Sequence, residues 1–305
     1  MPPSRAYSDP DAIAQIADLA LRSRRLAEGG ISGQHRSPFH GFNVEFAAYR
    51  DYAAGDDLRR LDWRVFARSD RHYIKQYEQE TNVRITFVVD ASASMNYKGA
   101  RAALSKFDYA ATLVVTLAML LARQQDPVGL VLFDEAAGTV LPPSATQSQI
   151  AVLTGLLQDC TPARPTELGG MLRSLTDRIK RRGLLVIVSD LFTDLDAVYD
   201  GLNRLRFQGH EVLMLQVLDR DELDLPFDGP TVFHDIEGEE ELFAEPGAFR
   251  KAYQGAIRDF LDGVKVECGK RGYDHVRFVT DEPLGAALGR FLRGREEMGR
   301  AGGRA

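Results

Sequence analysis

Asp90, Ser92 and Ser94 alternate along the segment that follows a short apolar run, 85–89. The run is too short for an isolated helix and is rich in β-branched residues, so we expect a buried parallel strand that ends at Asp90. A loop that continues the strand direction can turn all three side-chain oxygens towards one point. Carboxylate and hydroxyl oxygens suit a hard cation such as Mg2+ or Mn2+ rather than zinc. The segment therefore predicts part of a metal site.

Two further segments can supply oxygen ligands to the same ion. Asp190 follows a second apolar strand, 184–189, and Thr166 lies in a turn bracketed by proline and glycine before a helix. The carboxyl ends of the strands in an open α/β sheet form the edge where ligands bind. The predicted ligands are Asp90, Ser92, Ser94, Thr166 and Asp190. The alternative is that Asp90 and the serines simply cap the next helix, but a cap would not need the other two residues.

The elements that must position these residues alternate along the chain. Further strand patterns lie at 127–133, 211–218 and 275–280, and helical patterns at 100–124, 148–158, 167–182, 195–207, 246–271 and 283–293. Residues 138–141 can pair with the strand before them through a turn at 134–137. The alternation predicts an α/β fold with a doubly wound, mostly parallel sheet and right-handed crossovers, preceded by a small N-terminal α+β subdomain.

We expect four parts in the chain. Residues 1–40 form an N-terminal helix and a flexible loop, 41–83 a β subdomain, 84–296 the main α/β domain, and 297–305 a disordered tail. In the β subdomain, two strands near 44–46 and 73–77 flank a turn at 54–57 and a short helical turn at 58–63.

The β subdomain is dense in charges of both signs. Its arginines, Arg59, Arg60, Arg64, Arg68 and Arg71, could form a docking patch. Because acidic residues lie among them, we favour internal ion pairs over a basic field.

An acidic insertion interrupts the main domain at 221–245. It contains no lysine or arginine, and its carboxylates are Asp221, Glu222, Asp224, Asp228, Asp235, Glu237, Glu239, Glu240, Glu241 and Glu245. Apolar residues between them suggest a hairpin closed at Glu237 and Gly238. We favour a solvated acidic loop, and the alternative is a surface for a basic partner.

Composition limits the class of protein. With 305 residues and 44% hydrophobic residues, the chain can bury a large core. The net charge of -6 gives no basic field for nucleic acid, and the two cysteines lack disulfide or zinc spacing. The most apolar segment, 110–122, is shorter than the roughly 18 residues that a spanning helix needs, and no signal core is present. We therefore expect a cytoplasmic protein without a transmembrane segment.

Two motifs carry a family resemblance. The pattern Asp90-x-Ser92-x-Ser94 with Thr166 and Asp190 resembles the metal-ion-dependent adhesion site of von Willebrand factor A domains. The preceding segment resembles the signature of the bacterial domain-of-unknown-function fifty-eight (DUF58) family in Glu45, Phe46, Tyr49, Arg50, Tyr52, Gly55, Asp56, Asp57, Arg59, Asp62 and Trp63. The chain departs from the adhesion pattern with Leu191 where a glycine usually follows the aspartate, and with Pro165 before Thr166.

The resemblance implies a Rossmann-like fold and an association with MoxR-type AAA+ ATPases in assembling or activating other proteins. It implies that Ser92, Ser94 and Thr166 touch the ion directly, and that Asp90 and Asp190 act partly through water.

Our leading hypothesis is a metal-dependent protein-interaction module, not an enzyme. A partner's Asp or Glu would complete the coordination of the ion, and the β subdomain or the acidic insertion would supply a second contact. The alternative is a Mg2+-dependent phosphatase or nucleotide-processing enzyme centred on Asp90. That chemistry normally needs a carboxylate two residues later as general acid, where this chain has Ser92.

Overall fold

The computed structural model describes residues 7, 44–51, 73–79, 83–133, 138–163, 167–236 and 240–291. The helix expected within 1–40, the arginines at 59–71 and the tail at 297–305 lie outside these residues. So do Thr166 and the turns expected at 54–57, 58–63, 134–137 and at Glu237 and Gly238. The signature residues outside the described part are Tyr52, Gly55, Asp56, Asp57, Arg59, Asp62 and Trp63. Of Glu45, Tyr49 and Arg50, only the backbone is described.

The chain divides into two compact units, one of which is His35–Val83. In this unit β1 (Val44–Asp51) pairs antiparallel with β2 (Tyr73–Gln79). The register shifts between Phe46 and Ala48, as at a β-bulge. Both strands expected in this segment are present.

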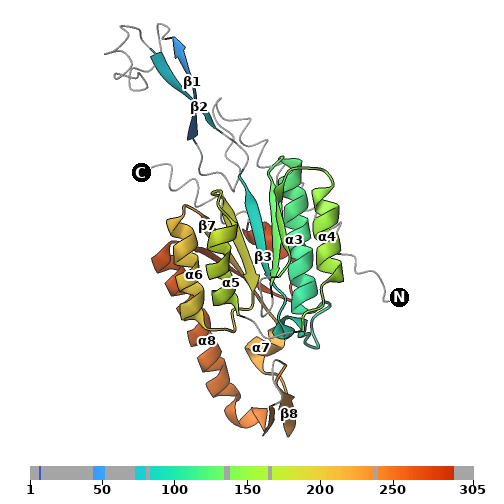
Figure 1. Ribbon diagram of the computed structural model, residues 1–305. Helices are drawn as coiled ribbons and strands as arrows, with labels where there is room; N and C mark the ends of the chain where they lie inside the picture. The colour runs from blue at the N-terminus through green and yellow to red at the C-terminus, as the bar shows by residue number, and fades with distance from the viewer. Residues whose placement is uncertain are drawn as a thin grey trace. The chain divides into compact units, whose positions relative to one another are not determined.

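A six-stranded sheet forms the centre of the second unit, in the order β10-β7-β6-β3-β4-β5 (Figure 1). Its strands are β3 (Ile85–Asp90), β4 (Val128–Phe133), β5 (Val140–Ser144), β6 (Leu184–Ser189), β7 (Glu211–Leu218) and β10 (Asp274–Val279). All neighbours are parallel except β4 and β5. The predicted mostly parallel α/β fold is confirmed.

The strand order reverses between β3 and β6. After β3 the chain adds β4 and β5 on one side, then returns to place β6 on the other side of β3. This reversal creates the switch point at which open α/β sheets bind ligands. Every residue of β3, β4 and β6 is buried, as expected for apolar strands covered on both faces.

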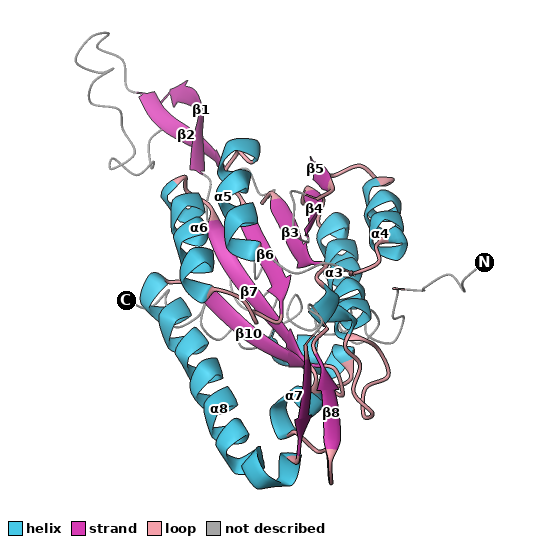
Figure 2. Cartoon of the chain, turned by 60° about the horizontal axis from the view of Figure 1, so that its bottom comes forward, coloured by secondary structure: helices cyan, strands magenta, loops and turns pink. Residues whose placement is uncertain are grey.

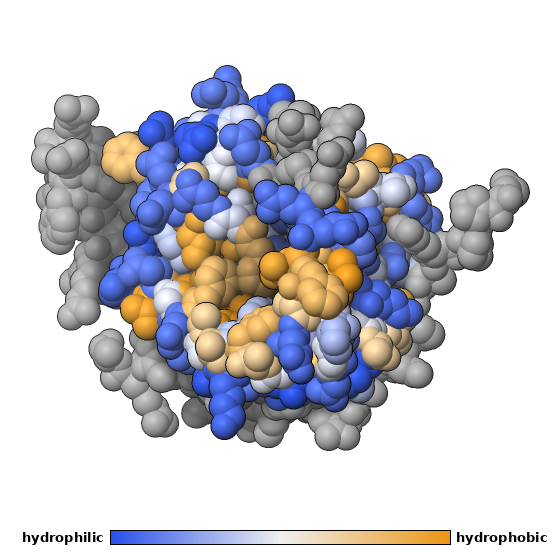
Figure 3. Space-filling view, turned by 90° about the horizontal axis from the view of Figure 1, so that it is seen from below, coloured by the Kyte–Doolittle hydropathy of each residue, from blue (hydrophilic) through white to orange (hydrophobic). Residues whose placement is uncertain are grey.

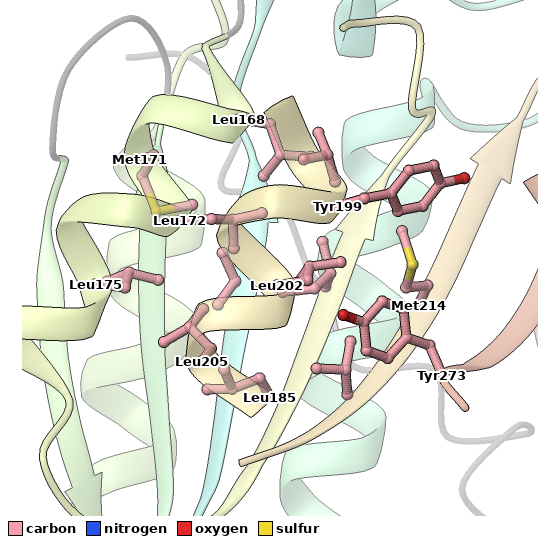
Figure 4. Packing of buried hydrophobic residues seen from close by; sticks show 14 of the residues in the cluster. Leu168, Met171, Leu172, Leu175, Leu185, Tyr199, Leu202, Leu205, Met214 and Tyr273 are labelled. Carbon is pink, nitrogen blue, oxygen red and sulfur yellow. The ribbon is translucent and has the colours of Figure 1, made fainter. Parts of the chain in front are cut away.

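Helices cover the sheet on both faces (Figure 2). They are α3 (Lys106–Arg123), α4 (Gln149–Asp159), α5 (Leu168–Arg178), α6 (Leu195–Phe207) and α8 (Pro246–Arg271), followed by a helical segment at 284–291. Figure 4 shows side chains of α5 and α6 meeting residues of the sheet in one apolar cluster, among them Leu172, Leu202 and Leu185. None of the helices in the described ranges is long and apolar enough to cross a membrane.

The long helix predicted from residue 100 begins later, at Lys106. Ser105 caps it by accepting a hydrogen bond from the N–H of Asp108. The N–H groups of Gly99 and Ala100 instead donate to Asp219 and Asp221, so this segment is held as a loop. The helix predicted at 167–182 likewise ends early, at Arg178.

The acidic insertion contains a short helix and a hairpin. Helix α7 (Arg220–Asp224) precedes β8 (Thr231–His234), which pairs antiparallel with β9 (Glu241–Ala244). The hairpin is confirmed, but the expectation of a wholly solvated acidic loop is wrong at its start. Asp221 is buried and Glu222 reaches into the protein, because both bind donors from other segments.

Candidate metal centre

Asp90 and Asp190 lie next to each other at the carboxyl edge of the sheet, because β3 and β6 are neighbouring parallel strands. Asp90 is the last residue of β3, and Asp190 directly follows β6. Both side chains are almost completely buried. The topology therefore brings together two carboxylates from distant parts of the sequence.

The loop after β3 turns its serine hydroxyls towards Asp190. The N–H of Ser92 donates to Oδ1 of Asp90 at 2.9 Å, which folds the loop over the strand end. Ser92 Oγ lies 3.0 Å from Ser94 Oγ, and Ser94 Oγ donates to Oδ2 of Asp190 at 3.0 Å. Four of the five proposed ligands are thus gathered, and the fifth, Thr166, is outside the described residues.

Asp90 is fully enclosed by the protein, with 0% of its surface exposed. Its Oδ2 accepts a hydrogen bond from Ser189 Oγ at 2.6 Å, while Oδ1 receives the Ser92 N–H. Burial, followed by repulsion from Asp190, raises the pKa of Asp90 to about 6 despite these hydrogen bonds. A nearby cation would relieve this accumulation of negative charge.

The loop after β6 fixes Asp190 through backbone donors. The N–H of Phe192 donates to Oδ1 of Asp190 at 3.0 Å, and Gln216 Nε2 donates to its carbonyl oxygen at 3.0 Å. Leu191 has a φ of 64°, the left-handed conformation that favours glycine. The loop therefore keeps a glycine-like turn even though the chain has leucine where adhesion sites usually have glycine.

Lys106 places an ammonium group beside the same carboxylate. Its side chain is 0% exposed, and Nζ lies 2.7 Å from Oδ2 of Asp190 and 2.5 Å from Oε1 of Glu222. Nζ also lies 5.3 Å from the centre of the Phe192 ring, within cation–π range. Burial alone would lower the pKa of Lys106, but Asp190 and Glu222 outweigh burial and raise the pKa.

Glu222 links the site to the insertion. It belongs to α7, where Asp219 and Glu222 form a capping box: Glu222 Oε2 accepts the N–H of Asp219 at 2.7 Å. Its other oxygen contacts Lys106, so one carboxylate both caps α7 and neutralises the buried ammonium. Glu222 therefore connects Lys106 to α7.

The oxygen donors fit a divalent cation. Ser92 Oγ, Ser94 Oγ and Asp190 Oδ2 form a continuous chain of 3.0 Å contacts. Hydroxyl and carboxylate oxygens are the ligands that Mg2+ and Mn2+ prefer. Within the part of the chain that the structure describes, no three His, Cys, Asp or Glu side chains are grouped to hold a metal, so the hydroxyls are needed. Two carboxylates, those of Asp190 and Glu222, contact the one ammonium of Lys106, so negative charge remains for a cation.

The molecule presents apolar surface at this end. Figure 3, viewed from below relative to Figure 1, shows apolar atoms around a hollow that is rimmed by polar residues. Phe192 is 38% exposed and stacks on Phe260 of α8, with ring centres 5.5 Å apart. The hairpin adds the exposed side chains of Leu242 and Phe243. The oxygen cluster therefore lies beside apolar groups that a protein partner could cover.

Comparison with protein families identifies the relatives of this chain. The family described as "Protein of unknown function DUF58" matches residues 48–260, more than two thirds of the sequence. The chain belongs to the DUF58 family. The resemblance inferred from the signature residues is thereby confirmed at the level of the family.

This DUF58 protein has relatives of similar length. Uncharacterized proteins from Mycobacterium tuberculosis and Mycobacterium bovis are each 28% identical to it over 300 residues, covering 96% of this chain and 93% of theirs. Among solved structures, the conserved hypothetical protein BatB from Bacteroides thetaiotaomicron is 17% identical, with a TM-score of 0.46 and coverage of 71% of this chain and 100% of BatB. A von Willebrand factor type A structure from Catenulispora acidiphila is 12% identical, with a TM-score of 0.34 and coverage of 48% and 34%.

Sequence reasoning missed Lys106 and Glu222. Lys106 stands at the start of a helix that is apolar nearly throughout, a position where a cation opposes the helix dipole. A lysine at this unfavourable position of an apolar helix indicates that it has a buried acidic partner. Glu222 lies three residues after Asp219, the spacing of a capping box, but sequence alone does not show that its second oxygen reaches Lys106.

Proposed function

We propose that this DUF58 protein is a non-enzymatic protein-interaction module that binds partners at the carboxyl edge of its sheet. A Mg2+ or Mn2+ ion held by Ser92, Ser94, Thr166 and Asp190, with Asp90 behind them, would bridge to a partner's Asp or Glu. When bound, the ion supplies an electrophilic centre for that carboxylate. The protein's own residues align the hydroxyls.

One observation carries this proposal. Ser94 Oγ lies 3.0 Å from both Ser92 Oγ and Asp190 Oδ2 at the switch point of the sheet. The partly exposed ring of Phe192 lies next to these oxygens. A cluster of hard oxygen donors beside an apolar surface suits recognition of a carboxylate within a protein interface. The exposed hairpin β8–β9 is a candidate for a second contact with the partner.

The position of Asp90 favours this proposal over an enzyme. A nucleophilic aspartate must reach the phosphorus atom of its substrate. Asp90 is fully buried, and both of its oxygens accept hydrogen bonds, from Ser92 and Ser189. These contacts suit a residue that positions the loop. Turnover of a phosphoester by the purified protein that disappears in Asp90→Asn would replace our proposal with the enzyme alternative.

The partner that we propose is a MoxR-type AAA+ ATPase, together with the client proteins of that ATPase. This choice rests on the family resemblance of the sequence. The signature segment, including Glu45, Tyr49 and Arg50, is a candidate second contact for the ATPase.

The test is binding of a purified MoxR-type ATPase to the immobilised protein at constant Mg2+ and nucleotide. We expect the double variant Ser92→Ala, Ser94→Ala to bind at least about tenfold more weakly, because the bridging ion loses two ligands. Ser144→Ala is the matched control, since Ser144 pairs with Val128 at the opposite edge of the sheet. Equal binding by the wild type and the double variant would contradict the proposed site.

A further inference from the structure

Lys106 breaks two rules of helix and core composition. It is the first residue of α3, where the helix dipole repels a cation, and its side chain is fully buried. A lysine is almost never fully buried unless it is paired with an opposite charge. Asp190 and Glu222 supply this charge at 2.7 Å and 2.5 Å, and the Phe192 ring covers the ammonium.

Lys106 shares its acceptor atom with the proposed metal site. Oδ2 of Asp190 receives both the hydroxyl of Ser94 and the ammonium of Lys106. The ion proposed above needs this same carboxylate, so the ammonium and the ion compete for it. The other carboxylate on Lys106 belongs to Glu222, which is 18% exposed and comes from the insertion.

We propose that Lys106 is the resident cation of this site, and that a divalent ion binds only by displacing the ammonium from Asp190 towards Glu222. This inference rests on the proposed function, because it concerns the same ligands. It makes Lys106 the residue that sets the affinity for metal. Metal binding would also change the contacts of the insertion, because Glu222 caps α7 and would then be the only carboxylate paired with the ammonium of Lys106.

The first test is a calorimetric titration of Mn2+ into chelator-treated wild type and into chelator-treated Lys106→Met. We expect Lys106→Met to bind one ion at least about tenfold more tightly, because a neighbouring positive charge has been removed from a low-dielectric site. Adding Ser94→Ala to this variant should abolish the gain. Lys98→Met, which removes an exposed lysine from the same loop, should leave the affinity unchanged.

The outcomes separate this inference from the proposed function. Equal affinity in wild type and Lys106→Met overturns the role of Lys106 but leaves the metal site in place. Absence of binding in both folded proteins overturns the role of Lys106 and the metal dependence together, while the ATPase binding experiment still decides whether the face is an interface.

A measurement on the wild type covers the case in which Lys106→Met does not fold. Acylation of lysines by an amine-reactive ester, read by mass spectrometry, reports exposure of Lys106 relative to Lys98. We expect Mn2+ to raise the acylation rate of Lys106 severalfold without changing that of Lys98. An unchanged rate at Mn2+ concentrations that saturate the titration would overturn the displacement.

Discussion

Leu191 keeps a left-handed backbone at the site without being glycine. Its φ of 64° costs about 1 kcal/mol for a residue with a Cβ atom. Its side chain is buried in the cluster that also contains Leu202 and Val198, and this burial offsets the strain. A leucine at this position therefore preserves the turn that presents the Asp190 carboxylate.

Replacement of Leu191 tests this balance. Leu191→Ala and Leu191→Gly should each destabilise the protein by about 2–4 kcal/mol, because both remove the buried side chain. Leu191→Gly should be the milder change by about 1 kcal/mol, since glycine adopts the conformation without strain. Urea unfolding measures the difference.

Leu202 is the matched control for this comparison, because it is equally buried but lies within α6. At this helical position, Leu202→Gly should lower the free energy of unfolding by about 1 kcal/mol more than Leu202→Ala. The same order of the two substitutions at both positions would contradict the proposed strain at Leu191.

His275 supports the site from behind through Gln216. Its Nε2 lies 3.1 Å from Oε1 of Gln216, whose Nε2 donates to the carbonyl of Asp190. Burial, with Arg277 and Lys265 as further causes, lowers the pKa of His275 to about 4. The folded protein therefore holds this histidine neutral where the unfolded chain would already bind a proton.

This shift predicts a loss of stability in mild acid. The contribution of neutral His275 is complete above pH 6.5 and is lost as pH falls towards 4. Between pH 7.5 and 5.0, wild type should lose about 1–2 kcal/mol more unfolding free energy than His275→Gln. Urea unfolding at both pH values measures this, with the exposed His234→Gln as the control that keeps the wild-type loss. Equal losses in wild type and His275→Gln would rule out the role of His275.

Helices α5 and α6 approach so closely that glycines form the contact. A Cβ atom added at Gly169 would lie 2.5 Å from Cβ of Ala197, and one added at Gly201 would lie 2.7 Å from Cβ of Leu172. These separations are far below van der Waals contact. The glycines therefore let α5 pack against α6 and fix the start of α5.

Alanine substitutions at two adjacent glycines test this packing. Gly169→Ala should destabilise the protein by about 1–3 kcal/mol, because α6 must move away. Gly170→Ala should be neutral or stabilise by up to about 1 kcal/mol, since its added Cβ would meet only the flexible side chain of Glu167 and alanine favours helix. Thermal unfolding compares the two. Similar effects of both substitutions would contradict a glycine-dependent helix contact.

The elements were predictable where the local sequence signals agree with one another. The patterns gave β6, α6, β7 and α8 with their observed bounds, since apolar periodicity, caps and glycine stops agree there. The start of α3 was missed because Asp219 and Asp221, distant in sequence, take the N–H groups of Gly99 and Ala100. The alternation of strands and helices was enough to predict that Asp90 and Asp190 lie at one edge of the sheet. The Lys106–Glu222 contact was not predictable, because it forms only when the distant insertion has folded against α3.

The whole molecule has distinct surfaces at the two edges of its sheet. The site, Phe192 and α7 lie at the carboxyl edge, and the insertion hairpin that follows α7 exposes Leu242 and Phe243, the latter with 73% of its surface in solvent. Phe207 lies at the opposite edge, at the end of α6 and before β7 begins. It is 94% exposed. Exposed apolar residues at both edges allow the interacting edge to be tested directly.

Serine substitutions distinguish the two edges. The double variant Leu242→Ser, Phe243→Ser should change the unfolding free energy by less than about 0.5 kcal/mol, because both side chains are already exposed. It should weaken binding to the MoxR-type ATPase by at least about fivefold, as expected for apolar side chains that the partner covers. Phe207→Ser should leave binding unchanged. Weaker binding only in Phe207→Ser would place the interface at the wrong edge for our proposal.

Site-specific photo-crosslinking tests the central claim most directly. A photo-reactive amino acid would replace Phe192 in one variant and Phe207 in another, and each would be irradiated with the purified MoxR-type ATPase in Mg2+. The proposed function predicts a crosslinked product from position 192 and none from position 207, because the partner covers the carboxyl edge of the sheet. A product from position 207 alone, or equal yields from the two positions, would contradict the assignment of that edge as the binding face.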